Sequence, residues 1–554
     1  MTATGVTDKE PDKSTVGNKS STDAESRISP SSKPPPDLIS RCIGEYGKWQ
    51  FLLTFLLSLL NFPCTFHIYS MTFEAAEGEY WCAKPPYLSH LSKQEWLRIS
   101  STNKTTSDGK EVYNACLIKD LDYSNLNLTS LTEDKLSNIV PRPCSRWEYD
   151  LSAFGETIIS EWDLVCENKQ YGNLAEMAFL VGVAVGGLAC GFISDRFGRK
   201  RTVMISLIAQ IIFGTAVALA PHFWIFIVVR GFLGFFSVSL VFSGFVLCVE
   251  LVGGKWVTIS GVSYLFPLPL SYIAISGIAY CIKGWRELQL AITLPAVCFL
   301  PLLWVLPESP RWLLSMGKSE KVLSVLEDAA KFNKMELPAS VDKLIKQEIS
   351  KGEASENQSP KVNLLDLYKT PRMRRTSFLL YILWFCVYIV YYGLVLNLSN
   401  LGGNVYINSI ISGAFELPAI AVSILILLKL GRRWPLSITM AAAGCACLLT
   451  IPAPKDEGSW LVLGLATLGR FCASSSNVIL PIFTADLFPT LLRNLGIGSS
   501  NAPSGIALIF VPYLWNMAGM NVNLPMAVLG VCGLVGSTAS LLLPDAWQAE
   551  SIES

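Results

Sequence analysis

The sequence predicts an all-α membrane protein in which twelve transmembrane helices form two pseudo-symmetric six-helix halves, with a large extracellular loop after helix 1. Composition, apolar runs and an internal repeat support this fold class. Of the 554 residues, 51% are hydrophobic and only 16% are charged, and the mean hydropathy is +0.41. Soluble domains are usually about a quarter charged, so most of this chain is expected to face lipid. The formal net charge is zero, which gives no global attraction to nucleic acid.

A spanning helix needs about 20 mainly apolar residues. The sequence contains twelve such runs, near residues 50–72, 171–194, 202–220, 223–249, 256–282, 286–306, 377–399, 404–430, 435–453, 458–485, 494–518 and 524–544. We therefore expect a disordered cytoplasmic tail (1–47), a first half (48–306), a cytoplasmic linker with amphipathic helices (307–376), a second half (377–545) and a second cytoplasmic tail (546–554).

The Lys and Arg residues of the short loops predict the orientation. Basic clusters follow the second run (Arg196, Arg199, Lys200 and Arg201) and the eighth run (Lys429, Arg432 and Arg433). These loops are expected in the cytoplasm, together with both termini, in a multi-pass protein of the plasma membrane.

The same orientation places residues 73–170 outside the cell. This loop carries two glycosylation sequons, at Asn103 and Asn127. It also carries Cys82, Cys116, Cys144 and Cys166, and an even number of cysteines in an oxidising compartment predicts two disulfides with three possible pairings.

An internal repeat relates the two halves. Four pairs of features recur 233 to 240 residues apart: Gly198 and Gly431, Arg230 and Arg470, Glu250 and Asp486, and Pro307 and Pro544. Halves repeated in this way are typical of transporters whose substrate site lies between them at the membrane midplane.

Charged residues at the cytoplasmic helix ends are expected to act as conformational latches, which hold a neighbouring helix end in one state and release it in another. A simple topology anchor is the alternative interpretation. The predicted latch residues are Asp195, Arg196, Gly198, Arg199, Arg230 and Glu250 in the first half and Arg432, Arg470 and Asp486 in the second.

These motifs resemble a known superfamily. GFISDRFGRKR (191–201) is similar to the Gly-x-x-x-Asp-Arg-x-Gly-Arg loop of the major facilitator superfamily, and Arg230-x-x-x-Gly234 resembles its fourth-helix motif. PESPRWLLSMGK (307–318), DLFPTLLRNLG (486–496) and the segment 147–166 resemble the organic cation, organic anion and carnitine transporters of solute carrier family 22. The resemblance implies the major facilitator fold and transport of a small organic ion.

Glu416 lies near the middle of the eighth run, where burying a carboxylate in the membrane is energetically unfavourable unless it has a partner or a function. It could anchor a cationic substrate, take up a coupled proton, or form a fixed pair with an arginine such as Arg470. In the seventh run, Trp384, Tyr388 and Tyr391 share one helix face. They could form an aromatic cage for an amine or serve only in helix packing.

The resemblance implies that Trp384, Tyr391 and Glu416 line the central site.

Gly505 is also predicted to face the substrate. The resemblance implies an aspartate here in cation transporters and an arginine in anion and carnitine types, whereas this chain has no side chain. Close helix packing is the alternative. Val238 and Val241 also depart from the family, since cation transporters have a lysine and a tryptophan there.

We therefore expect an alternating-access transporter of small organic cations or zwitterions, such as amines or carnitine-like compounds. An organic anion carrier and a non-transporting receptor or scaffold are the alternatives. No phosphate-loop or dinucleotide motif is complete, and only three histidines are present. We expect no enzymatic activity, cofactor or metal site, and we expect the lipid bilayer, the substrate and an unspecified coupling ion as partners.

Overall fold

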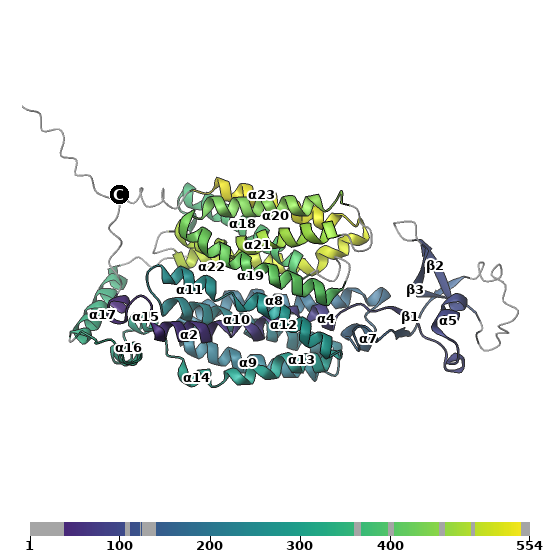
Figure 1. Ribbon diagram of the computed structural model, residues 1–554, viewed down its shortest axis with the longest axis horizontal. Coiled ribbons are helices and arrows are strands. Elements are labelled where there is room, and N and C mark those ends of the chain that lie inside the picture. Colours follow the sequence, from purple (N-terminus) through teal and green to yellow (C-terminus); the bar gives the residue numbers. More distant parts are fainter. Residues whose placement is uncertain are drawn as a thin grey trace, which may run out of the picture.

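The computed structural model describes residues 38–105, 111–121, 123, 140–338, 340–358, 367–396, 404–453, 460–488 and 493–544. An elongated helical bundle has small β-strands at one end and the linker helices at the other (Figure 1). We call these ends the strand end and the linker end. Each of the twelve predicted apolar runs overlaps a helical segment. Eight of the described helices are long and apolar enough to cross a membrane.

The first half lies below the second in Figure 1 and is coloured from purple to teal. Its long apolar runs form helices because helical hydrogen bonds satisfy the backbone N–H and C=O groups, which lipid cannot do. Its elements are α2 (Lys48–Ser58), α3 (Asn61–Tyr69), α4 (Met71–Glu74), α8 (Gln170–Phe197), α9 (Arg199–Ala218), α10 (Phe223–Glu250), α11 (Trp256–Ser263), α12 (Pro267–Cys281), α13 (Trp285–Thr293), η5 (Leu294–Phe299) and α14 (Leu302–Val305).

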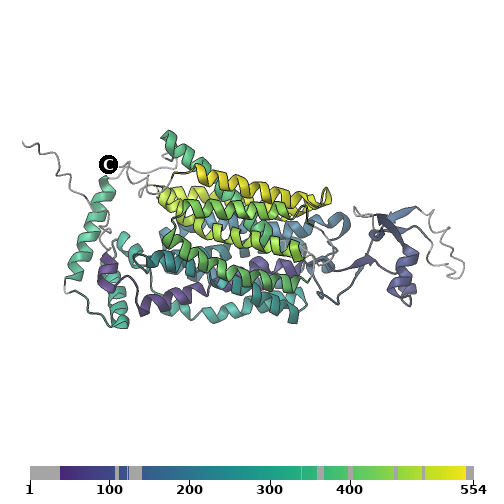
Figure 2. The ribbon, with the colours of Figure 1, turned by 45° about the horizontal axis from the view of Figure 1, so that its top comes forward.

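The second half, coloured green to yellow, packs along the first in both views (Figures 1 and 2). Its first helix starts six residues before the predicted run, because Thr370 caps it and Pro371 opens it. The elements are α18 (Pro371–Val395), α19 (Val405–Lys429), α20 (Arg433–Leu449), α21 (Trp460–Leu487), α22 (Arg493–Leu514), η8 (Trp515–Gly519) and α23 (Leu524–Leu542).

Glycines let helices approach closely within each half, as is common in membranes. A Cβ atom at Gly186 of α8 would lie 2.6 Å from the Phe235 carbonyl oxygen of α10. In the second half, a Cβ atom at Gly444 of α20 would lie 2.8 Å from the Gly530 carbonyl oxygen of α23.

The strand end is a small folded unit with two antiparallel sheets, ordered β1-β5 and β2-β3-β4. Disulfides join Cys82 to Cys144 and Cys116 to Cys166. Asn103 lies in β2, whereas Asn127 lies outside the described residues. The elements are β1 (Tyr80–Cys82), η1 (Pro86–Leu88), α5 (Lys93–Ser100), β2 (Ser101–Thr105), β3 (Glu111–Lys119), β4 (Pro141–Pro143), β5 (Trp147–Tyr149), α7 (Ile158–Glu161) and η4 (Cys166–Asn168).

The linker end contains α15 (Pro310–Ser315), α16 (Ser319–Asn333) and α17 (Val341–Gln358), together with α1 (Leu38–Ile43). The helix α1 buries Ile39 and Ile43 in one apolar cluster with Val322 and Leu326 of α16. Residues 38–43 therefore form a packed helix within the segment 1–47 that is predicted to be a disordered tail.

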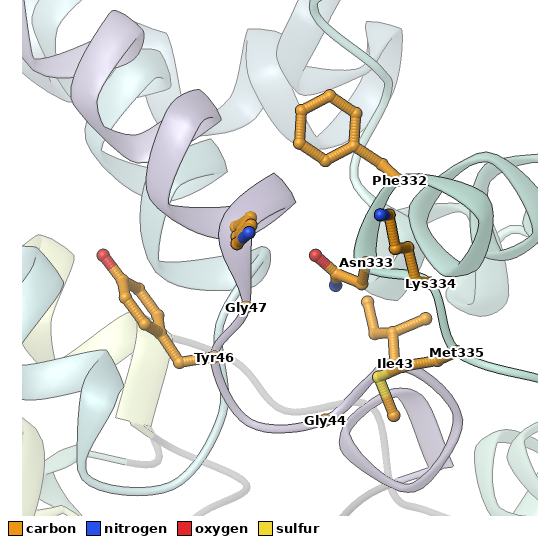
Figure 3. A pocket seen from close by; sticks show the side chains of 9 residues that line it. Ile43, Gly44, Tyr46, Gly47, Phe332, Asn333, Lys334 and Met335 are labelled. Carbon is orange, nitrogen blue, oxygen red and sulfur yellow. The ribbon is translucent and has the colours of Figure 1, made fainter.

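Asn333, at the end of α16, fastens this unit to the first half. It accepts a hydrogen bond from the Trp49 backbone N–H at 2.9 Å and donates one to Gln50 at 2.9 Å. A pocket of about 400 Å³ lies beside this contact, and Figure 3 shows Asn333 and Lys334 facing the α1–α2 connection across it.

The two halves contact each other toward the strand end. Tyr406 of α19 stacks on Phe73 of the first half with ring centroids 5.4 Å apart, and it meets Tyr280 at 5.6 Å and Phe154 at 6.1 Å. These aromatic contacts join the first residues of α19 to the ends of α4 and α12, and they hold the halves together at this end.

Candidate functional site

Glu416 of α19 lies in a buried polar cluster of the second half. Its Oε2 atom lies 2.9 Å from Nη2 of Arg470 on α21. Its Oε1 atom accepts hydrogen bonds from the hydroxyls of Tyr391, at 2.7 Å, and Ser474, at 3.1 Å. Arg470 also donates to the Ser412 hydroxyl. The predicted pair between Glu416 and Arg470 is thus present, and both carboxylate oxygens are satisfied, as a buried charge requires.

Tyr272 of α12 brings the first half into contact with this cluster. Its hydroxyl lies 3.5 Å from that of Tyr391 and also contacts that of Tyr69. The Arg470 guanidinium lies 4.7 Å from the centroid of the Tyr272 ring. The Glu416–Arg470 pair therefore lies at the interface between the halves. A change in the relative position of the halves would alter the contacts of Tyr272 with Tyr391 and Arg470.

The aromatic residues of α18 form a continuous row beside the pair. Ring centroids are 5.5 Å apart for Trp384 and Tyr388, 5.7 Å for Tyr388 and Tyr392, and 5.0 Å for Tyr391 and Tyr392. Trp384 donates to the Thr484 hydroxyl at 3.0 Å and is buried, as is Tyr391. Tyr388 and Tyr392 are only partly buried, so they are the more accessible residues of this row.

Gly505 of α22 lies against α8 of the other half. A Cβ atom at this position would come within 2.8 Å of the Ala184 Cβ atom and 3.5 Å of its Cα atom. In this structure the missing side chain thus permits a close contact between halves, which matches the packing alternative.

A second buried pair lies in the first half. Glu74 of α4 and Arg230 of α10 are both fully buried, with Nη1 and Oε2 3.3 Å apart. The Arg230 Nη2 atom also lies 3.4 Å from the Ser70 hydroxyl. Glu74 is not among the predicted site residues, because it follows the predicted apolar run by two residues. Its partner Arg230 is 156 residues away along the chain, so no local sequence pattern indicates the pair.

Arg230 and Arg470 lie away from the other predicted latch residues. Arg230 is seven residues into α10 and Arg470 is ten residues into α21, counted from the helix ends away from the linker. Both are paired with buried carboxylates, because an arginine within an apolar helix requires such a partner. Neither belongs to the charge clusters at the linker end.

The first linker-end cluster is centred on Arg199. Its guanidinium lies 2.7 Å from Asp195 and 3.1 Å from Glu250 at the end of α10, and it donates to the Ser194 carbonyl oxygen at 3.1 Å. The Glu250 side chain is 18% exposed and that of Asp195 is 69% exposed. The contact with Glu250 is therefore the better shielded from water.

Gly198 lets the connection between α8 and α9 pack closely against Glu308 and Trp312 at the start of the linker. Its φ of +104° favours glycine, and a Cβ atom here would lie 2.5 Å from Oε2 of Glu308. Glu308 accepts a hydrogen bond from the Lys200 backbone N–H at 2.9 Å, and Trp312 donates to the Asp195 carbonyl oxygen at 2.8 Å. The segment PESPRW thus fastens the start of the linker to this connection.

The second linker-end cluster is smaller. Arg432, just before α20, forms an ion pair with Asp486 at the end of α21. Arg196 lies on the exposed side of α8, with its guanidinium 6.0 Å from the centroid of the neighbouring Phe197 ring. The structure therefore brings Asp195, Arg199 and Glu250 together in the first half and Arg432 and Asp486 in the second. The other charged residues predicted as latches, Arg196, Arg230 and Arg470, lie outside these two clusters.

Two helical halves with the buried Glu416–Arg470 pair at their interface form the arrangement of a membrane transporter. Residues 127–539 match the family model described as "Sugar (and other) transporter". The chain is 33% identical over 515 residues to an organic cation transporter protein of Drosophila melanogaster, with 91% of this chain and 90% of the relative covered. It is 32% identical to solute carrier family 22 member 4 of Mus musculus, with 92% of each covered.

Solved structures show the same fold. The proton:xylose symporter XylE superposes with a TM-score of 0.58 at 17% identity, covering 90% of this chain and 97% of that chain. An inward-open structure of XylE from E. coli gives 0.57 at 14% identity, covering 91% and 99%. The chain belongs to the major facilitator superfamily and, within it, to solute carrier family 22.

Proposed function

We propose that this protein is a secondary, alternating-access transporter of small organic cations, with zwitterions that carry an amine as further substrates. The carrying observation is the position of Glu416, which lies at the interface of the halves and is bound by Tyr391, whose ring meets the partly buried ring of Tyr392. The relatives named as organic cation transporters support the same substrate class.

The charge balance at the site suggests how a cation binds. Glu416 and Arg470 neutralise each other, so a cation that approaches Glu416 must share or replace the arginine. Ser412 can retain Arg470 while Tyr391 and Ser474 hold the carboxylate. Aromatic faces contribute about 0.5–2 kcal/mol each to binding an ammonium group.

The contacts between halves support alternating access. In the proposed orientation, the linker end lies in the cytoplasm and the strand end lies outside. The aromatic contacts of Tyr406 then close the outer side, and opening it requires them to separate along with the contact between Gly505 and Ala184. The Arg199 and Arg432 clusters would rearrange during the same movement.

The test compares substrate classes in cells that express the protein. Uptake of a quaternary ammonium cation, a betaine and a dicarboxylate is measured at matched surface levels. We expect saturable uptake of the cation, weaker uptake of the betaine and none of the dicarboxylate. Preference for the dicarboxylate would support an anion carrier, and absence of all uptake would support a receptor or scaffold; either result would overturn the proposal.

A further inference from the structure

A basic pocket of about 240 Å³ lies at the linker end of the second half, among α18, α20 and α23. Arg372, Arg375 and Arg433 line it, together with apolar atoms of Leu379 and Leu542. Among the described residues that line the pocket, none is acidic. Three guanidinium groups around one small volume favour an anionic occupant.

The arginines are placed by the local structure. Arg372 and Arg375 lie in the first turns of α18 and are three residues apart, so they share one helix face. Arg433 opens α20 and donates to the Leu541 carbonyl oxygen near the end of α23. Arg374 is also exposed and close in sequence, but it does not line the pocket.

The surroundings of the pocket match the boundary of a membrane. Phe378, one turn further along α18, is 64% exposed, and Leu542 is 55% exposed. Trp434, next to Arg433, is 59% exposed, and tryptophan is enriched at the level of lipid headgroups. A ligand with an anionic head and apolar chains would contact both the arginines and these apolar side chains.

We infer that this pocket binds the headgroup of an anionic phospholipid of the cytoplasmic leaflet. The inference rests on the proposed orientation, in which the linker end is cytoplasmic, the side where anionic lipids gather. The planar guanidinium groups of Arg372 and Arg375 can each donate two hydrogen bonds to phosphate oxygens. Acyl chains would extend over Phe378 and Leu542, and a free phosphate would leave these side chains uncovered.

The experiment measures lipid binding and not transport, so its failure is distinguishable from failure of the proposed function. The full-length protein in neutral detergent is titrated with phosphatidylserine or phosphatidylcholine, and bound lipid is counted by native mass spectrometry. Each basic residue near an anionic headgroup contributes about 1 kcal/mol, or roughly fivefold in affinity. The variant Arg372→Gln/Arg375→Gln should therefore bind phosphatidylserine about 25-fold more weakly, with phosphatidylcholine binding unchanged.

Arg374→Gln is the matched control and should retain wild-type binding. An equal loss in the control would show that diffuse charge and not the pocket attracts the lipid, and no loss in the double variant would overturn the site. If soluble glycerophosphoserine binds with the same affinity as phosphatidylserine, the pocket binds a free anion and not a lipid. If the double variant is not recovered, each single variant should lose about fivefold, and unchanged binding in both would contradict the inference.

Discussion

Glu416 and Arg470 form an ion pair across α19 and α21, with 2.9 Å between Oε2 and Nη2, while Tyr391 holds the other carboxylate oxygen. Each charge is therefore compensated in a buried position. Glu416 can therefore have two roles. Its carboxylate can stabilise the fold by pairing with Arg470, and it can bind the ammonium group of a substrate.

Neutralising both partners distinguishes these roles. Glu416→Gln should lower surface expression as well as cation uptake, because an uncompensated buried charge costs about 3–5 kcal/mol. Glu416→Gln/Arg470→Gln should restore surface expression but not uptake of a quaternary ammonium cation. Recovery of wild-type uptake in the double variant would show that the carboxylate is needed only for Arg470.

The contact between Gly505 and Ala184 predicts a compensating pair. Gly505→Ala adds a Cβ atom 2.8 Å from the Ala184 Cβ atom, which disfavours this approach of α22 to α8. Turnover at matched surface level should fall several-fold, and Ala184→Gly in the same chain should restore it. A loss that Ala184→Gly does not relieve would contradict an origin in this contact.

The Arg199 cluster predicts an order of effects. Glu250→Gln should lower maximal uptake per surface copy more than Asp195→Asn, because the Glu250 side chain is better shielded from water. Kinetic analysis of uptake with surface biotinylation measures this. Equal maximal rates in wild type and Glu250→Gln would argue against a latch, and the reverse order would assign the main contact to Asp195.

The disulfide pairing predicts a difference between single and double cysteine variants. Closing the 50-residue separation between Cys116 and Cys166 stabilises the fold by about 4 kcal/mol in the chain-entropy account. Cys116→Ser should impair surface expression more than Cys116→Ser/Cys166→Ser, because it leaves Cys166 free to exchange with the other disulfide. Peptide mapping without reduction checks the pairing, and a Cys82–Cys116 linkage would contradict it.

The sequence predicts the helical class and the repeat well, because long apolar runs and recurring glycine and arginine positions are local signals. It predicts only some of the partners. The pair between Glu416 and Arg470 is one of the sequence-based alternatives, whereas only the structure shows that Arg230 meets the buried carboxylate of Glu74 away from the linker end. Glu74 and the Cys82–Cys144 pairing depend on contacts between distant segments, which a single sequence does not encode locally.

The most direct test of the central claim is uptake by the purified protein in proteoliposomes. Vesicles that contain only this chain should accumulate tetraethylammonium with saturable kinetics, and vesicles with Glu416→Gln/Arg470→Gln should not. Uptake no greater than that of protein-free vesicles, with the wild-type protein folded and inserted, would contradict a transporter of organic cations.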